Sequence, residues 1–136
     1  ALVRPAPDRS KGKFAIEVSV DNTVPPTEQW EQGGITWYHE GKPVFKLVKE
    51  RIDGDTWIIP GKKPVPNVKV AFRLVVTADG WTAQYRTDPK KEYVTAAEGK
   101  LPPPGKDEVS IQCYNGPTEG AHWIRFDDFR IVQLPE

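Results

Sequence analysis

A hairpin signal in the first half of the chain constrains the fold more than any other feature. The run from Trp30 to Glu50 is WEQGGITWYHEGKPVFKLVKE. A glycine pair precedes a strand-like stretch at 35–39, and the turn at 40–43 (EGKP) leads into a second stretch at 44–50. Two strands joined by a tight turn that contains glycine and proline form a β-hairpin. The run therefore predicts antiparallel β-structure.

Strand signals of the same kind recur along the rest of the chain. Apolar and polar residues alternate at 14–20 and 68–77, and the Asp79-Gly80 turn leads into a strand at 81–86. Further short strands are expected at positions 57–59, 93–96, 109–114 and 123–132. About nine short strands separated by turns are typical of an antiparallel sandwich or barrel. We expect one all-β domain over residues 1–136, in which residues 1–12 form a leader or loop.

Composition limits the classes of partner. With 136 residues and 38% hydrophobic content, the chain has the size of one compact domain. Its 19 basic and 19 acidic residues cancel, so no global field favours nucleic acid or an anionic membrane surface. No uninterrupted apolar stretch approaches the roughly 20 residues of a membrane-spanning helix. We therefore expect neither a nucleic-acid nor a membrane partner.

The last strand contains an irregularity. Phe126 and Phe129 have opposite parity, and both face the core only if the strand bulges near Asp127 and Asp128. A bulge re-aims a carboxylate, so Asp127 or Asp128 is a candidate ligand for a structural calcium ion. The alternative is that both carboxylates bond nearby backbone amides. The lone cysteine, Cys113, alternates with apolar residues and is expected to be a buried free thiol.

The outward positions of the strands carry groups that suit sugars. Amides and guanidinium groups bond to hydroxyls, arginine binds carboxylates with two hydrogen bonds, and aromatic rings pack on sugar rings. The candidate contacts are Tyr38, Arg73, Gln84, Arg86 and Tyr114, with Trp57 at the rim. An ordinary solvated sheet face also carries polar residues, and the sequence leaves both interpretations open.

Catalysis is less favoured. Glycoside hydrolysis needs two carboxyl groups on opposite sides of the scissile bond, about 5 to 9.5 Å apart. Acids at alternate positions of one strand would share a face, but no such acidic triplet occurs here. Glu50, Asp53 and Asp55 come nearest, and Gly54 places them in a turn. We therefore name no catalytic residue.

Three segments together resemble a known superfamily. GGITWYHEGKPVFKLVKERIDG, FRLVVTADGWTAQYRTD and HWIRFDDFRI are similar to hairpins and to the final strand of small jelly-roll domains of the concanavalin A-like lectin/glucanase (LamG-like) superfamily. The likeness covers roughly residues 14 to 133. It implies an antiparallel β-sandwich of jelly-roll type, similar to the accessory domains that stand beside β-xylosidases and arabinanases.

The resemblance also implies a function. We expect a non-catalytic, lectin-like domain of an extracellular bacterial protein that binds an oligosaccharide or polysaccharide. The alternative is a structural module that docks onto other domains or a partner chain, and a glycoside hydrolase is the third interpretation. Domains of this kind normally begin with an extra strand pair, of which ALVRP (1–5) would be only the tail. An open sheet edge would then favour a partner domain or a homodimer.

Overall fold

The computed structural model describes residues 2–135, which form eleven strands and one short 3-10 turn, η1 (Arg9–Lys11). The strands are β1 (Leu2–Pro5), β2 (Phe14–Asn22), β3 (Gln32–His39), β4 (Lys42–Ile52), β5 (Asp55–Ile59), β6 (Lys63–Pro64), β7 (Val70–Val76), β8 (Gly80–Arg86), β9 (Val94–Lys100), β10 (Asp107–Tyr114) and β11 (Ile124–Gln133). In this described part, no helix is long and apolar enough to cross a membrane.

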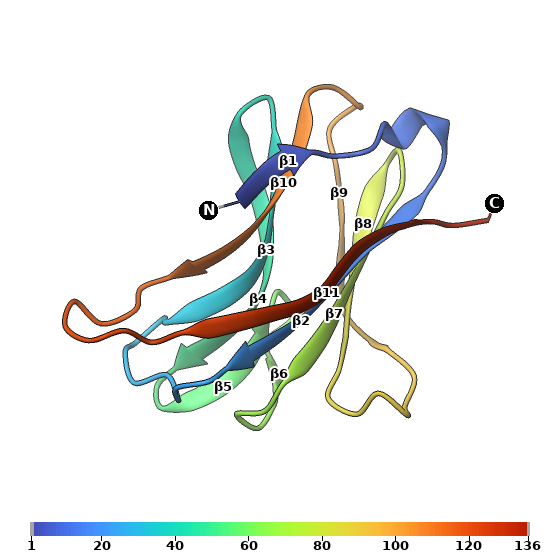
Figure 1. Cartoon of the computed structure of the whole chain (residues 1–136). Coiled ribbons are helices and arrows are strands. Elements are labelled where there is room, and N and C mark those ends of the chain that lie inside the picture. Colours follow the sequence, from blue (N-terminus) through green and yellow to red (C-terminus); the bar gives the residue numbers. More distant parts are fainter. Residues whose placement is uncertain (1, 136) are drawn as a thin grey trace.

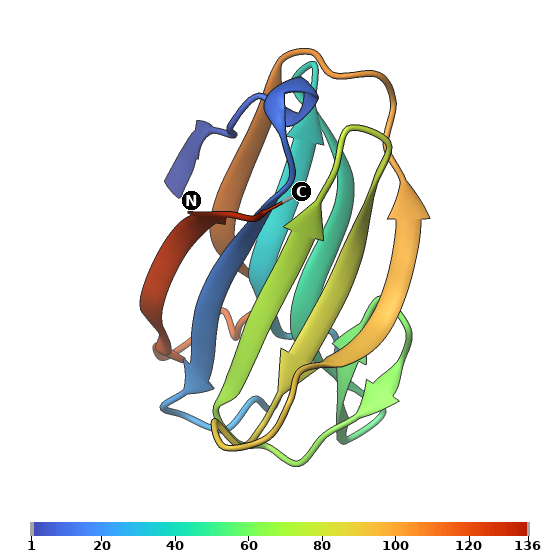
Figure 2. The same cartoon turned by 90° about the vertical axis from the view of Figure 1, so that its right-hand side faces the viewer.

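The strands form two sheets that pack face to face. Sheet A has the order β1-β10-β3-β4-β5-β6, and sheet B has the order β11-β2-β7-β8-β9. Figure 1 shows the two layers, and Figure 2 shows sheet B in front, from β11 in red to β9 in orange. The strand pairs are antiparallel throughout. The predicted all-β, jelly-roll type of sandwich is confirmed.

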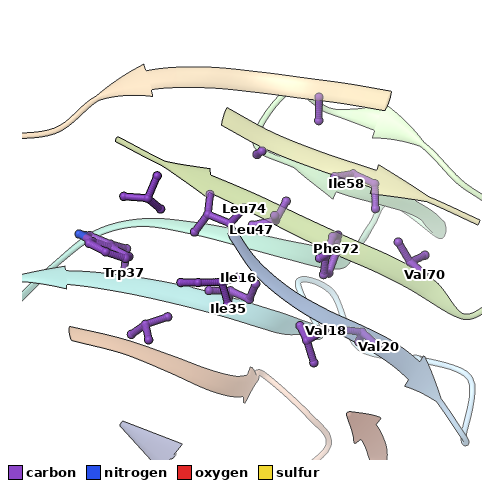
Figure 3. Packing of buried hydrophobic residues seen from close by; sticks show 14 of the residues in the cluster. Ile16, Val18, Val20, Ile35, Trp37, Leu47, Ile58, Val70, Phe72 and Leu74 are labelled. Atoms are coloured by element: carbon purple, nitrogen blue, oxygen red, sulfur yellow. The ribbon is translucent and has the colours of Figure 1, made fainter. Parts of the chain in front are cut away.

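Alternation along the strands builds the core between the sheets. In β7, Val70, Phe72 and Leu74 are fully buried, whereas the residues between them are partly exposed. Figure 3 shows Leu74 of β7 beside Leu47 of sheet A in the space between the two sheets. Because side chains alternate between the two faces of a strand, the same alternation turns polar residues outward on both sheets. The sandwich therefore has two separate outer faces.

The N-terminal stretch differs from the expected leader. Leu2–Pro5 forms β1, an edge strand that pairs with β10. Arg9 follows and is almost completely buried. Its Nε donates to Asp107 of sheet A over 2.8 Å, and its Nη atoms donate to the carbonyls of Ala78 and Pro102, beside sheet B. Arg9 therefore ties the two sheets together at this end, a role that alternation cannot reveal because Arg9 lies outside the strands.

A second buried cation links the sheets at the other end. Lys49 points inward from β4 and is only 3% exposed. Its Nζ donates to the carbonyl of Val68 over 2.7 Å and to Oδ1 of Asn67 over 3.3 Å. Burial lowers the pKa of Lys49 from 10.5 to about 8, and the nearby charge of Asp21 opposes this shift.

The bulge in the last strand is confirmed, but the environment of Cys113 was predicted wrongly. The register of β11 against β2 shifts between Asp127 and Arg130, so Phe126 and Phe129 both pack against the core. Cys113 lies near the end of β10 and is exposed. In the alternation of β10, Cys113 occupies a position that would face the core. However, the pairing of β1 with β10 ends at Ile111. An open groove between β10 and β11 leaves Cys113 accessible to solvent.

Candidate functional site

The structure divides the predicted sugar-binding residues between the two outer faces. Tyr38, Trp57 and Tyr114 belong to sheet A, whereas Arg73, Gln84 and Arg86 belong to sheet B. The six predicted contacts therefore do not share one face. Each points outward from its own strand, but the two sheets of a sandwich turn their outer faces in opposite directions. Two candidate sites result, and each has its own chemistry.

The tyrosine face is the outer face of sheet A. It comprises Gln32, Gly34, Thr36, Tyr38, Lys46, Glu50, Trp57, Ser110, Gln112 and Tyr114. Thr36 and Ser110 are each only 1% exposed, although no third layer of the described residues covers this face. Neighbouring side chains on the same face therefore shield these hydroxyls from water.

A hydrogen-bond network connects the tyrosine face. The hydroxyl of Tyr114 lies 3.2 Å from Oγ1 of Thr36. Nε2 of Gln112 donates to the hydroxyls of Tyr38 and Ser110. These groups fix one another's rotamers, because each shares a hydrogen bond with a neighbour. The network holds two aromatic rings in place with little further loss of side-chain entropy on binding.

Lys46 and Glu50 add charge to the tyrosine face. Nζ of Lys46 donates to Gln32 over 2.7 Å and lies 4.7 Å from the centre of the Tyr114 ring. Burial raises the pKa of Glu50, and the positive charge of Lys46 opposes this rise. One cation and one partly buried carboxyl group therefore accompany the neutral hydroxyl network.

The two tyrosine hydroxyls differ in acidity. Burial alone would raise the pKa of Tyr38, but hydrogen bonds with three neighbouring side chains, Ser110 first, outweigh burial and lower it. Burial is the main cause that raises the pKa of Tyr114, and the adjacent Tyr38 adds to it. The surroundings therefore shift the pKa values of the two hydroxyls in opposite directions.

A glycine leaves the middle of the tyrosine face without a side chain. Gly34 stands opposite Gln112 on one side and Val48 on the other. A Cβ at Gly34 would lie 2.1 Å from the backbone oxygen of Leu47, so the close approach of β4 requires glycine here. Gly34 is itself buried, so this position serves the packing of β3 against β4.

Trp57 lies at the far end of a row that crosses four strands. The row runs from Tyr114 through Gln32 and Glu50 to Trp57. At about 4.8 Å per strand, its two aromatic ends stand about 14 Å apart. Nζ of Lys62 lies 5.3 Å from the centre of the Trp57 ring. The row has the length of an extended ligand.

The arginine face is the outer face of sheet B. It comprises Glu17, Arg73, Gln84, Arg86, Tyr93 and Arg130. The guanidinium carbon of Arg86 lies 4.2 Å from the centre of the Tyr93 ring, and that of Arg73 lies 5.8 Å from it. Gln84 stands at the edge, where its Nε2 donates to Oγ1 of Thr95 over 3.4 Å. This face is ionic, in contrast to the tyrosine face.

Asp127 and Asp128 lie at the border of the arginine face. Nε of Arg125 lies 2.9 Å from Oδ2 of Asp127, and Nζ of Lys69 lies 3.8 Å from the same oxygen. These cations already compensate the Asp127 carboxylate, which fits Ca²⁺ ligation poorly. Asp128 is exposed in a left-handed conformation at φ 56°. Among residues 2–135, no cluster of three or more metal-ligating side chains occurs. Calcium binding stays a prediction.

Two exposed tryptophans mark one end of the sandwich. Trp30 is 56% exposed and Trp123 is 71% exposed. Between their loops, Nδ1 of His122 lies 2.9 Å from Oε2 of Glu31, whose other oxygen accepts the backbone amides of Thr27 and Glu28. Glu31 therefore pins the loop before β3 to the loop before β11.

Sequence reasoning missed several residues of both faces. Lys46 points outward from β4 and pairs with Thr36 of β3. A bulge between Trp37 and Tyr38 shifts the pairing of the two strands, so the sequence did not show which residue lies opposite Lys46. Tyr93 was expected in a strand and instead lies in the loop before β9. Glu17 and Arg130 face each other across β2 and β11, and only the bulge brings them into register. No local pattern announces these contacts.

Comparisons with known proteins establish the fold. No family model and no curated protein sequence matches this chain. Among solved structures, the K247S mutant of the GH43 protein BlXynB from Bacillus licheniformis is similar, with a TM-score of 0.75 and 18% identity. The similarity covers 97% of this chain but only 29% of that one.

Two further structures share the sandwich. A functionally unknown protein from Saccharomyces cerevisiae has a TM-score of 0.64 at 12% identity, which covers 99% of this chain and 74% of that one. The alginate lyase from Klebsiella pneumoniae has a TM-score of 0.60 at 10% identity, which covers 90% and 59%. At such low identities the likeness shows the fold alone.

Proposed function

We propose that this chain is a non-catalytic carbohydrate-binding or accessory domain that takes its ligand on the tyrosine face. The observation that carries the proposal is the hydroxyl and amide network on the outer face of sheet A, which links Thr36 to Tyr114 and Gln112 to Tyr38. A sugar presents alternate hydroxyl groups and apolar C–H faces. The network offers hydrogen-bond donors and acceptors to the sugar hydroxyls. The rings of Tyr38 and Tyr114 can pack against the apolar C–H faces.

The row of four strands sets the ligand length. Tyr114 and Trp57 stand at its ends, with Gln32 and Glu50 between them. A single sugar ring does not reach both aromatic side chains across about 14 Å. The ligand is therefore an oligosaccharide or a stretch of polysaccharide that lies across the strands.

The parent protein acts on polysaccharides outside the cytoplasm. The structural neighbours support this context: one is a GH43 protein and another is an alginate lyase. This chain corresponds to less than a third of the GH43 protein, the remainder of which has no counterpart here. An accessory domain increases the local concentration of a neighbouring module on its substrate by multivalent binding.

A glycan array of the isolated chain tests the proposal. We expect selective binding of neutral oligosaccharides by the wild type and a loss of about tenfold or more for Tyr114→Ala, since each tenfold corresponds to about 1.4 kcal/mol. Tyr114→Phe keeps the ring and should retain part of the affinity. Tyr93→Ala is the matched control, because it removes a tyrosine from the opposite face.

Two results of this array would count against the proposal. A folded domain that binds no glycan contradicts the proposal, and so does binding that Tyr93→Ala abolishes while Tyr114→Ala leaves it intact.

A parallel array with Ca²⁺ and with a chelator tests the calcium prediction at Asp127 and Asp128. Binding that depends on Ca²⁺ and is lost in Asp128→Asn would support a structural ion at the bulge.

An apolar groove favours a second candidate function, docking onto another domain or a partner chain. The groove has a volume of about 540 Å³ and is lined by Leu2, Ile111, Gln112, Cys113, Phe126 and Phe129. Leu2 is 78% exposed on β1, whose outer edge pairs with no strand among residues 2–135. Sedimentation at rising concentration tests self-association. A dimer that Leu2→Glu dissociates would support docking, and a monomer at all concentrations would remove the homodimer.

A further inference from the structure

The arginine face holds a pocket that the proposed function does not use. The pocket has a volume of about 250 Å³ and lies over β2, β7, β8 and β11. Its lining includes Glu17, Ser19, Lys69, Arg86, Tyr93 and Arg130. Because it opens on sheet B, it lies on the opposite side of the sandwich from the tyrosine face.

Arg86 is positioned to receive a ligand. Its guanidinium group packs on the Tyr93 ring at 4.2 Å, and one Nη atom donates to the carbonyl of Lys91 over 3.2 Å. Its Nε is buried and has no hydrogen-bond partner among the described residues. A buried donor without a partner destabilises the fold, so an acceptor atom of a ligand that reaches this Nε gains a hydrogen bond.

The arginine face has more guanidinium groups than carboxylates to pair with them. Glu17 accepts a hydrogen bond of 2.7 Å from Arg130 and lies 3.9 Å from Nε of Arg73. The Nε of Arg73 is also buried without a hydrogen-bond partner among the described residues. Arg86 has no acidic partner within 4 Å in the described part of the chain. Arg73 and Arg130 therefore share one glutamate, and Arg86 is left without a carboxylate partner among the described residues.

We propose that this pocket binds the carboxylate of an acidic sugar, with Arg86 as its main contact. A guanidinium group matches the two oxygens of a carboxylate with parallel hydrogen bonds, and the Tyr93 ring fixes the plane of the fork. Ser19, Thr87 and Asp128 also line the pocket, and their oxygens suit the hydroxyl groups of the same sugar.

The pocket size fits one sugar ring. Pockets for drug-sized ligands usually span roughly 300–1,000 Å³, and this one is smaller. The pocket therefore accepts a terminal or protruding uronate residue rather than several consecutive rings. This site is independent of the tyrosine face, because the two sites share no residue and lie on different sheets.

Calorimetric titration of the whole chain tests the proposal. The probes are trimers of galacturonate, mannuronate and guluronate, with neutral galactotriose as the uncharged comparison and acetate as the free carboxylate. We expect at least one uronate trimer to bind, with an affinity that Arg86→Gln lowers about tenfold or more. Arg86→Lys keeps the charge but lacks the fork, and should fall between the wild type and Arg86→Gln.

Matched variants separate this site from the tyrosine face. Arg4→Gln removes the same charge from the exposed β1 and should leave the affinity within twofold. Tyr114→Ala should also leave uronate binding unchanged. The proposal is overturned if no uronate trimer binds, if Arg86→Gln and Arg4→Gln behave alike, or if acetate binds as tightly as the trimers. A loss in Tyr114→Ala alone would overturn it too, by assigning the uronate to the tyrosine face.

Discussion

The two outer faces of the sandwich arise from the same strand alternation but differ in their chemistry. On the tyrosine face, neutral hydroxyls and amides satisfy one another, and Thr36 and Ser110 are nearly inaccessible. On the arginine face, Arg73 and Arg130 share Glu17, and Arg86 packs on the Tyr93 ring. Hydrogen bonds between neutral groups depend little on salt, whereas ion pairs at a surface are screened by it.

This difference shows that binary patterning decides where polar residues point but not what they can bind. Both faces satisfy an alternating pattern equally well. Their separate chemistries come from cross-strand neighbours, such as Tyr114 beside Gln32 on one face and Glu17 beside Arg130 on the other. The predictions below test whether the two faces behave as separate sites on one rigid frame.

The largest loss of stability should come from removing the buried Arg9–Asp107 ion pair, which links the two sheets. Arg9→Leu leaves the carboxylate of Asp107 buried without its cation, which typically costs about 3–5 kcal/mol. His39, whose Nδ1 lies 2.7 Å from Asp107, compensates only part of this loss. We expect a large fall in the urea midpoint and equal broadening of amide signals on both faces. Broadening confined to one sheet would contradict a shared clamp.

A smaller effect should come from adding a side chain at Gly34, in the middle of sheet A. Gly34→Ala brings a Cβ against the backbone of β4 and should cost about 1–3 kcal/mol. Gly116→Ala is the control, because no atom lies within 4 Å of a Cβ built there. Thermal unfolding of both variants measures the difference. Equal melting temperatures would show that β3 and β4 do not approach as closely as described.

The interior between the faces should respond to pH through Lys49. Its pKa is lowered to about 8 in the fold, so the unfolded chain binds more protons at pH 8–10.5. The free energy of unfolding should therefore rise with pH, by about 1 kcal/mol between pH 7 and pH 9. Urea titrations across this range measure the slope. Lys49→Met should flatten it, and an unchanged slope in that variant would assign the effect to another group.

The smallest losses of stability are expected for single polar substitutions on the two faces. Their dependence on salt concentration should differ between the faces. Glu17→Gln removes the carboxylate that Arg73 and Arg130 share and should cost about 0.5–1 kcal/mol at low ionic strength, and less at 1 M NaCl. Thr36→Val removes a hydroxyl from the tyrosine face and should cost about 1 kcal/mol at either salt concentration. Chemical denaturation with urea measures both. A similar salt response in the two variants would remove the contrast between the faces.

The sequence predicted the sandwich well because its signals are local. Alternation in β2 and β7 placed the core correctly, and the opposite parity of Phe126 and Phe129 located the bulge in β11. Trp37 and Ile35 alternate in the predicted strand at 35–39, and both are fully buried. These features depend on neighbouring residues in one strand, which a sequence displays directly.

The site was predicted less well because it depends on which strands become neighbours. Tyr38 and Arg86 share outward parity, and only the assignment of their strands to different sheets separates them. Cys113 has the parity of a core residue, yet the open seam beside β10 exposes it. Arg9 lies outside any alternating strand and forms a buried tie between the sheets. Such contacts span long sequence separations and leave no local pattern.

Amide chemical-shift mapping tests the central claim that the tyrosine face is the carbohydrate site. The wild-type chain is titrated with the neutral oligosaccharide that binds most strongly on the array. The account predicts shifts on sheet A along the row from β10 to β5, around Tyr114, Gln32 and Trp57. The amides of Arg73 and Arg86 on sheet B should not move. Shifts confined to sheet B, or spread evenly over both faces, would contradict it.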